Sequence, residues 1–414
     1  MEERLMPELR FPEFSGEWER KTLGELGGFY NGLSGKNKGD FVKGNRKYIQ
    51  YLNVFDNTLI KSGFTEYGYV SINKNEKQNT VEYGDVLFTQ SSETMDEVGM
   101  TSVYIGNEEE IYLNSFSFGY RIFGLDQFDS RYMGFMLRSN NVRKKIIREG
   151  QGSTRFNLSP NRVRNIKCFI PSLPEQERIG DFFYKIDKRL ELQQKRIEAL
   201  KEQKKGMMQK IFSQEIRFKD DDGKDYPEWE EKKLGEIAKL QGGYAFKSED
   251  YKTEGTPIVR ISNIKGYIDI DSDIIYADGD KIPKQYTVKK GDLLIAMSGA
   301  TTGKSGIYDY DSFAYLNQRC GKFTSTPNLY YPYLYSWIES DFFREQLSIR
   351  LIAGAQPNIS GSDVESMKIS LPTLPEQTKI ANFLSALDRR IELEEQKLEE
   401  SRQFKKGLMQ RMFI

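Results

Sequence analysis

The chain has 414 residues, which is enough for two or three domains, and its 61 Lys and Arg balance its 61 Asp and Glu. It has no histidine and only two cysteines, which excludes Ser-His-Asp and Cys-His catalysis, histidine-containing zinc sites and Cys₄ sites. Carboxylate-based metal chemistry stays open, but no metal site can be singled out and we expect none. No apolar run could span a membrane, the N-terminus is too charged for a signal peptide, and so few cysteines suit a reducing compartment. We therefore expect a cytoplasmic protein without membrane contact.

Two similar units follow one another along the chain. After a lead-in at 1–17, the first unit opens at Trp18 with WERKTLGEL, and the second opens at Trp229 with WEEKKLGEI. Both continue as short strands interrupted by glycine and asparagine, and GDVLF in the first matches GDLLI in the second. A helix is predicted near the end of each, at 131–148 and 331–349. The pattern predicts an α+β fold, strand-rich with helices, in each unit, joined by a linker at 213–228.

A long amphipathic helix closes each unit, and the two helices are copies of one sequence. Residues 172–212 begin SLPEQ, residues 373–413 begin TLPEQ, and the copies align without a gap at an offset of 201. Steps of three and four residues mark a heptad seam. The apolar seam positions are Ile179, Phe183, Ile186, Leu190, Ile197, Leu200 and Met207 in the first copy, and Ile380, Leu384, Leu387, Ile391, Leu398, Leu408 and Met412 in the second.

One such helix cannot bury its own stripe, so we predict that the two copies pair; the alternative is two separate core helices. Polar seam positions, such as Lys204 and Lys405, weaken the pair but could fix its register or receive another protein. The spacing S/T-x-x-E at the start of both copies predicts capping boxes, Ser172 with Glu175 and Thr373 with Glu376. The duplication suggests a pseudo-two-fold molecule.

One stretch, SGATTGKS at 298–305, is similar to a phosphate-binding P-loop. The pattern requires a glycine where Ser298 stands, and no clear helix follows it. The Asn/Asp-Pro-Pro-aromatic loop of DNA methyltransferases is absent, because the chain contains no Pro-Pro, and a Rossmann glycine fingerprint is also missing. The sequence therefore offers no catalytic residue.

Polar and aromatic loops are the remaining signal, because Arg, Lys, Asn, Gln, Ser and Thr contact base edges and phosphates. Taken singly, each of these residues is better explained as ordinary exposed loop than as a contact to a base. The candidates in the first unit are Lys36, Lys38, Arg46, Lys47, Gln50, Tyr51, Asn53, Gln90, Ser91, Ser92, Arg155 and Asn157. Those in the second are Tyr244, Lys247, Arg260, Ser262, Asn263, Lys284, Thr301, Thr302, Lys304, Gln356 and Asn358.

The twin LPEQ helices, the paired openings WERKTLGEL and WEEKKLGEI, the GDVLF and GDLLI segments and PELRFPEFSGEW together resemble the specificity subunit of bacterial type I restriction–modification systems. The resemblance covers nearly the whole chain. It implies target-recognition domains at 1–171 and, with the linker, at 214–372, each reading one half of a bipartite DNA site. It also implies that the helices at 172–213 and 373–414 form an antiparallel coiled coil that sets the spacer between the half-sites.

The same resemblance implies the partners: double-stranded DNA, two modification subunits that methylate adenine, and two restriction subunits. S-adenosylmethionine, ATP and Mg²⁺ are expected on those partners, and this chain is expected to be non-catalytic and to hold no cofactor. Because its net charge is zero, we expect weak DNA binding by the chain alone. Two alternatives stay open: a coiled-coil scaffold that joins two protein-binding domains without DNA contact, and an ATPase with an irregular P-loop.

Overall fold

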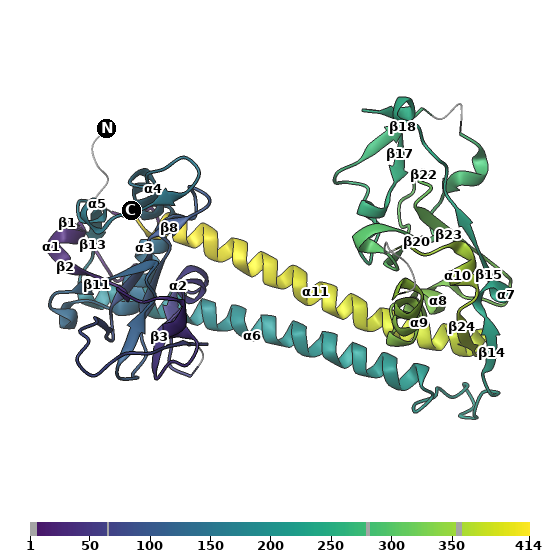
Figure 1. The fold of residues 1–414 in the computed structure, drawn as a ribbon, viewed down its shortest axis with the longest axis horizontal. Coiled ribbons are helices and arrows are strands. Elements are labelled where there is room, and N and C mark those ends of the chain that lie inside the picture. The colour runs from purple at the N-terminus through teal and green to yellow at the C-terminus, as the bar shows by residue number, and fades with distance from the viewer. Residues whose placement is uncertain (1–5, 64–65, 279–281, 353–357) are drawn as a thin grey trace. The chain divides into compact units, whose positions relative to one another are not determined.

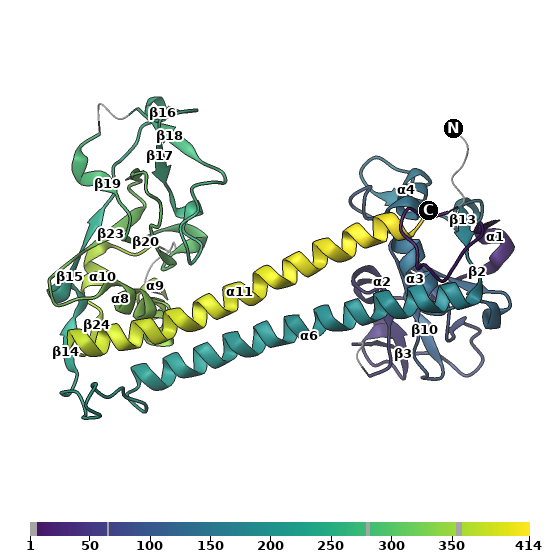
Figure 2. The ribbon, with the colours of Figure 1, turned by 180° about the vertical axis from the view of Figure 1, so that it is seen from behind.

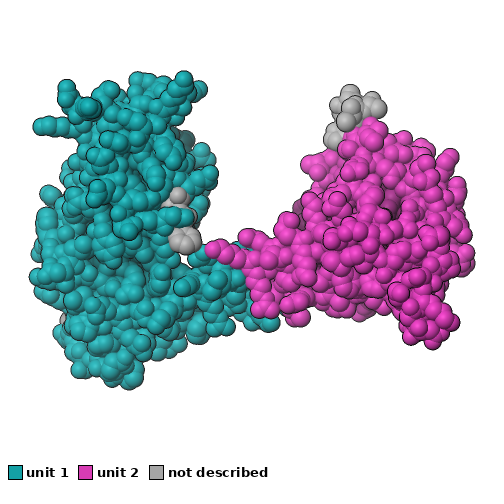
Figure 3. All heavy atoms as spheres, turned by 90° about the horizontal axis from the view of Figure 1, so that it is seen from below, with its two compact units in different colours: residues 1–194, 396–414 teal, residues 195–395 magenta. Residues whose placement is uncertain are grey.

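A computed structural model describes residues 6–63, 66–278, 282–352 and 358–414. The chain divides into two compact units, unit 1 with residues 1–194 and 396–414 and unit 2 with residues 195–395 (Figure 3). Each unit therefore contains a globular part and a half of both long helices, whereas the predicted division made each helix a segment of its own. Unit 2 is one continuous stretch of chain.

Unit 1 combines β-sheets with short helices (Figure 1). A five-stranded sheet has the order β2-β11-β7-β9-β4, a four-stranded sheet the order β5-β3-β10-β6, and β1 pairs with β13 and β12 with β8. The strands are β1 Glu19–Thr22, β2 Gly27–Asn31, β3 Arg46–Ile49, β4 Leu59–Ile60, β5 Gly68–Val70, β6 Thr80–Val81, β7 Val86–Thr89, β8 Ser91–Ser92, β9 Thr101–Tyr104, β10 Ile111–Leu113, β11 Ser117–Ile122, β12 Phe156–Asn157 and β13 Lys167–Ile170. The helices are α1 Leu23–Leu26, α2 Tyr51–Asp56, α3 Ser130–Arg138, α4 Asn140–Arg148 and α5 Pro160–Val163.

Unit 2 repeats this plan with β15-β23-β20-β21 as one sheet, β16-β18-β17-β22-β19 as another, and β14 paired with β24. The strands are β14 Glu230–Lys233, β15 Ala238–Gly242, β16 Tyr251–Lys252, β17 Thr256–Val259, β18 Ile275–Ala277, β19 Thr287–Val288, β20 Leu293–Ala296, β21 Ser305–Ile307, β22 Ala314–Leu316, β23 Cys320–Ser325 and β24 Lys368–Leu371. The helices are α7 Leu234–Ile237, α8 Tyr331–Ile338, α9 Asp341–Ile352 and α10 Gly361–Glu365.

The repeated Gly-Asp pair before the central strand explains why GDVLF and GDLLI recur. Gly84 and Gly291 have positive φ angles of 87° and 91°, a conformation that glycine adopts without a Cβ clash. The next residue, Asp85 or Asp292, accepts the backbone N–H three residues before it, at 2.8 Å in both units. The strands that follow, β7 and β20, are buried at every position. The turn is thus followed by a fully buried strand in the interior of its sheet.

Each predicted helix near the end of a unit is in fact two helices, so those two predictions were wrong. In unit 1 the break falls at Ser139, which has an extended backbone (φ −63°, ψ 149°) between α3 and α4. In unit 2 it falls between α8 and α9, where Ser340 Oγ donates to the Trp337 carbonyl at 2.5 Å. The apolar periodicity continues on both sides of each break, which is why the sequence indicated one helix.

The long helices are α6 Leu173–Phe212 and α11 Leu374–Met412. In unit 1, Lys405 of α11 forms an ion pair with Asp187, and Arg402 donates to Gln194 of α6 at 3.3 Å. As the residue number rises in one helix it falls in the other, so the two halves are antiparallel (Figures 1 and 2).

Unit 2 repeats the same ion pair 201 residues away, between Lys204 Nζ and Asp388 Oδ1 at 2.5 Å, and adds Arg196 to Glu394 at 3.6 Å. No apolar seam position of either helix is fully exposed, and Phe183, Ile380 and Leu384 are completely buried. The predicted fold class, strand-rich α+β units with two antiparallel paired helices and an internal repeat, is confirmed.

The two glutamates of the LPEQ motifs are buried in equivalent clusters, which we call glutamate clamps. Glu175 accepts two hydrogen bonds from the Arg10 guanidinium, both at 2.7 Å, and one from the Trp18 indole at 3.3 Å. In unit 2, Glu376 accepts from Arg217 at 3.0 and 3.3 Å and from the Trp229 indole at 3.0 Å. The segment before each globular part is thereby fixed to the first turn of its long helix.

These clamps contradict the predicted capping boxes. Both carboxylates are turned to Arg and Trp, and the Thr373 hydroxyl is buried without a hydrogen bond to any described residue. The neighbouring glutamines, Gln176 and Gln377, hold the start of the domain's own helix, since their side-chain oxygens accept from the backbone N–H of Asp129 and Tyr330 at 3.2 and 2.9 Å. The motif is therefore a docking device between helix and globular part.

Candidate nucleic-acid interface

Three of the predicted loops of unit 1 come together at one place. The Tyr51 hydroxyl, on the first turn of α2, donates to the Ser91 carbonyl at 2.7 Å. Strand β8, which contains Ser91, pairs with β12, and the Leu158 N–H donates to the Gln90 carbonyl at 2.8 Å. The segments around residues 50–56, 90–97 and 155–158 therefore form one surface, which we call the loop cluster.

A fourth segment joins the loop cluster at a turn that an asparagine holds in both units. Asn114 Oδ1 accepts the N–H of Phe116 at 2.9 Å, and the Phe116 carbonyl accepts the N–H of Gln90 at 2.8 Å. In unit 2, Asn317 Oδ1 accepts the N–H of Arg319 at 3.1 Å, and the Arg319 carbonyl accepts from Met297 at 2.9 Å. Phe116 and Arg319 thus occupy equivalent places.

Equivalent segments of unit 2 form a second loop cluster with the same backbone pairings. The Ile359 N–H donates to the Met297 carbonyl at 2.9 Å, and Ser298 bridges to Asn358 as Ser91 pairs with Asn157. The 3₁₀ turn Ile261–Asn263 replaces α2, and its Ile261 carbonyl accepts from the Thr301 hydroxyl at 3.1 Å. Backbone and short polar side chains therefore build the same scaffold twice.

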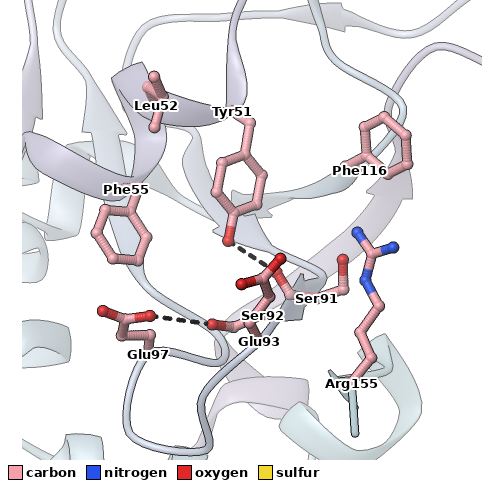
Figure 4. Close-up of a pocket in the computed structure, with 9 residues that line it drawn as sticks. All are labelled: Tyr51, Leu52, Phe55, Ser91, Ser92, Glu93, Glu97, Phe116 and Arg155. Atoms are coloured by element: carbon pink, nitrogen blue, oxygen red, sulfur yellow. Dashed lines mark hydrogen bonds between the residues drawn. The ribbon is translucent and has the colours of Figure 1, made fainter. Parts of the chain in front are cut away.

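In unit 1 the loop cluster encloses an open pocket of about 440 Å³ (Figure 4). The rings of Tyr51 and Phe55 stack at 6.1 Å between centroids, and burial raises the pKa of the Tyr51 hydroxyl, so it stays a hydrogen-bond donor. The Glu97 carboxylate accepts from the hydroxyls of Ser92 and Thr94 at 3.3 and 2.8 Å and so shapes the loop. The pocket is lined by Tyr51, Leu52, Phe55, Ser91, Ser92, Glu93, Glu97, Phe116 and Arg155.

Four predicted residues of unit 1 line this pocket, namely Tyr51, Ser91, Ser92 and Arg155. The others that belong to the loop cluster support it: Gln50 and Gln90 lie beside it, Asn53 Oδ1 accepts the Gln50 N–H at 2.8 Å, and Asn157 donates to the Arg155 carbonyl at 3.4 Å. Arg155 is exposed, and its guanidinium makes no ion pair with a described residue. It is therefore available to a ligand.

The remaining candidates of unit 1 are held by carboxylates outside the cluster. Lys36 is only 5 % exposed at its side chain and lies 2.6 Å from Glu76. Arg46 pairs with Glu110 at 3.0 Å, and Lys47 with Glu108 at 3.2 Å. Lys38 is exposed at the start of a 3₁₀ turn. These cations already have partners within unit 1, Lys38 excepted.

The candidates of unit 2 fall into three groups. Arg260, Ser262, Asn263, Thr301, Thr302, Lys304 and Asn358 belong to the loop cluster; Lys304 and Ser262 are exposed, whereas Asn263 is buried and accepts the Arg260 N–H at 2.9 Å. Arg260 itself reaches Asp273 at 3.2 Å. Tyr244 and Lys247 line a separate cavity of about 420 Å³ that also contains Asp250 and Asp278, and Lys284 is exposed on a 3₁₀ turn. Gln356 lies outside the described residues.

The sequence analysis missed several exposed residues of the loop clusters: Leu52, Glu93, Glu97, Phe116 and Arg319. The signal was present, because LNSF and LNQR share the asparagine that holds the turn, and the residue two positions later is the one presented. Arg319 and Lys304 form no ion pair with a described residue.

The P-loop alternative does not fit the structure. Residues 298–305 connect β20 to β21, two antiparallel strands, so a strand follows the glycine-rich stretch where a P-loop requires a helix. The Thr302 hydroxyl donates to the Gly299 carbonyl at 2.7 Å, within the loop itself. Among the described residues no group of three His, Cys, Asp or Glu side chains could hold a metal ion. None of the helices described is long and apolar enough to cross a bilayer.

The family model and the known proteins that match this chain all point to one family. A family model described as "Type I restriction modification DNA specificity domain" matches residues 15–202 and 226–401. The chain is 30% identical over 294 residues to the type I restriction enzyme MjaVIII specificity subunit of Methanocaldococcus jannaschii, with 68% of each chain covered. It is 26% identical over 427 residues to the putative MjaX specificity subunit of the same organism, covering 96% of this chain and 93% of that one.

A solved structure shares the fold over the whole length. The crystal structure of a type I restriction–modification S subunit from M. genitalium superimposes with a TM-score of 0.56, at 16% identity, and 99% of each chain is covered. At this identity the similarity concerns the fold.

Proposed function

The chain belongs to the family of type I restriction–modification specificity subunits, and from this premise we propose that each of its two units reads one half of a bipartite DNA sequence. One observation carries the proposal: the same loop cluster is built twice from backbone pairing and two asparagines, yet different side chains are presented on it. A shared backbone scaffold that presents different side chains suits two domains that recognise different half-sites.

The loop clusters supply the groups that such reading requires. Unit 1 presents Arg155 with the rings of Tyr51 and Phe116, and unit 2 presents Arg319 and Lys304. Arginine makes paired hydrogen bonds to guanine, and lysine and backbone N–H groups bind phosphates. The candidates that are already paired, such as Lys36 and Lys47, are assigned no contact with DNA.

We further propose that the paired helices set the spacer between the half-sites and receive the modification subunits. Their outer faces carry exposed apolar side chains, Leu192 and Phe404 in unit 1 and Leu393 in unit 2, which are 55–64% exposed. Exposed apolar residues on a charged helix favour contact with a protein partner. Two modification and two restriction subunits are the expected complement, with S-adenosylmethionine, ATP and Mg²⁺ on those partners.

In this proposal the chain acts by binding and performs no catalysis itself. Its two cysteines are buried and unpaired, which fits the reducing cytoplasm. Since its net charge is zero, much of the phosphate neutralisation must come from the partners, and the chain alone should bind DNA weakly.

The test is to express the chain with its modification subunit in cells that lack other adenine methylation, and to sequence the modified adenines. We expect one motif made of two specified halves separated by unspecified bases. Methylation without any bipartite motif contradicts the proposal. A scaffold without DNA contact, the alternative from another class, predicts that omitting this chain leaves the set of methylated sites unchanged.

A further inference from the structure

The pocket of unit 1 contains a carboxylate and a guanidinium group that have no partner among the described residues. Glu93 and Arg155 are both exposed, both line the pocket, and neither side chain forms a hydrogen bond or ion pair with a described residue (Figure 4). Glu97, in contrast, is held by two hydroxyls. Glu93 is therefore the carboxylate that this surface offers to a ligand.

An unpartnered carboxylate is unfavourable on a surface that approaches a polyanion, because phosphates repel it. It becomes favourable only where it meets a hydrogen-bond donor. In the major groove, the cytosine N4 amino group is the donor that carboxylates accept from, and the paired guanine offers O6 and N7 to an arginine. One C·G pair thus presents a partner for Glu93 and a partner for Arg155.

The equivalent surface of unit 2 lacks this combination. Counting from the paired serines, Ser91 and Ser298, Ala300 takes the place of Glu93. Arg319 takes the place of Phe116, which is 58% exposed and lines the unit 1 pocket. Only unit 1 therefore has a carboxylate at this position. The half-site of unit 2 needs no nucleobase that donates a hydrogen bond to a carboxylate at the equivalent position.

We propose that Glu93 and Arg155 together read one C·G base pair in the half-site of unit 1, with Glu93 accepting from cytosine N4 and Arg155 donating to guanine. This inference rests on the proposed function, because it assumes that the loop cluster faces DNA. Glu93 also acts against wrong sequences, since thymine or guanine would place an acceptor opposite its carboxylate.

The experiment compares the methylated motif of the wild-type complex with those of Glu93→Gln, Arg155→Gln and Arg319→Gln. We expect a C·G pair in one half of the wild-type motif. In Glu93→Gln and Arg155→Gln, preference for that pair should fall roughly tenfold or more, with the other half unchanged. Arg319→Gln should instead change only the other half.

Matched controls are Glu109→Gln and Arg148→Gln, which alter exposed charges of unit 1 outside the pocket. Competition binding of the purified complexes to four duplexes, one for each base pair at the position, measures discrimination even for a variant that methylates poorly. A wild-type complex with no bipartite motif would overturn the proposed function. A clear wild-type motif that the two pocket variants read with unaltered discrimination, or that has no C·G pair in either half, would overturn this inference alone.

Discussion

At the scale of single residues, each glutamate clamp contains a buried carboxylate that is paired with an arginine. Glu175 is 1% and Glu376 0% exposed at the side chain, and each accepts from an arginine and a tryptophan. A buried carboxylate is stable only while its donors are present, because desolvation of the charge must be offset. The hydrogen bond to Glu175, together with the negative charge of that carboxylate, raises the pKa of the Arg10 guanidinium.

Replacing Glu175 by glutamine keeps the shape of the side chain and removes its charge. We expect Glu175→Gln to lower the free energy of unfolding of unit 1 by about 2 kcal/mol, the range for hydrogen bonds to charged groups. Urea unfolding followed by tryptophan fluorescence, in a background where Trp229 and Trp337 of unit 2 are replaced by phenylalanine so that Trp18 at the site gives the signal, measures the change. Glu177→Gln, an exposed neighbour on the same helix, is the control, and equal stability of the two variants would refute the clamp.

The two cysteines give a second prediction at this scale. Burial raises the pKa of the Cys168 and Cys320 thiols to about 12, far above the ordinary value of about 8.5. At about pH 8 almost no thiolate is present in the folded chain, whereas the unfolded chain has an appreciable fraction. Iodoacetamide labelling read by mass spectrometry should therefore modify neither cysteine in the native protein and both in urea. Rapid labelling of the native protein would contradict this.

At the scale of elements, the repeated Lys–Asp pair specifies how the helices meet. Lys405 with Asp187 and Lys204 with Asp388 are the same pair in two units, and both lysines are less than 20% exposed. Each lysine lies at a seam position, where a polar residue weakens apolar packing and restricts the register. In an antiparallel pair of copied helices, a favourable contact made in one unit is made in the other as well.

Charge reversal in unit 1 tests this role. Lys405→Glu places two carboxylates together and should destabilise unit 1 by about 1 kcal/mol, the upper range for a partly exposed pair. Adding Asp187→Lys restores the opposite charges and should recover most of the loss, which thermal unfolding of both variants measures. Lys406→Glu changes the next, exposed residue and should have little effect. Additive losses in the double variant would show that the two residues are not coupled.

The sequence predicted those elements whose signal is local. The heptad seam, the strands after Gly84 and Gly291 and the internal repeat follow from periodicity and turn residues, and all are present. The broken helices were missed because Ser139 interrupts no apolar pattern. The partners of Glu175 were missed because Arg10 lies 165 residues away along the chain. Of the exposed charged residues that line the unit 1 pocket, the sequence analysis listed Arg155 but not Glu93, since an acidic side chain is not an obvious candidate for DNA contact.

At the scale of the whole molecule, each unit contains a half of both helices, and the division falls at Gln194/Lys195 and Glu395/Gln396. An insertion at these two points lengthens both helices without touching either globular part. Seven residues preserve the seam, because they add one heptad. They also add about 10 Å to each helix at about 1.5 Å per residue.

If the helices set the spacer, this double insertion should lengthen the accepted spacer by about three base pairs, at about 3.4 Å each, and leave both half-sites unchanged. Methylation of a series of synthetic sites with different spacers measures the shift. Insertion of four residues at the same points rotates the seam and serves as the control, with loss of activity expected. If the preferred spacer length stays the same, the proposal that the helices set the spacer is contradicted.

The continuity of unit 2 has a consequence for inheritance. Its clamp, its loop cluster and its share of both helices are encoded by one uninterrupted run of codons, 195–395. Exchange of that run between two related genes, with crossovers inside the copied helices, replaces unit 2 while every contact within unit 1 is retained. If the proposed function holds, the host cell thereby acquires a new recognition specificity in a single genetic event, with half of the old one preserved.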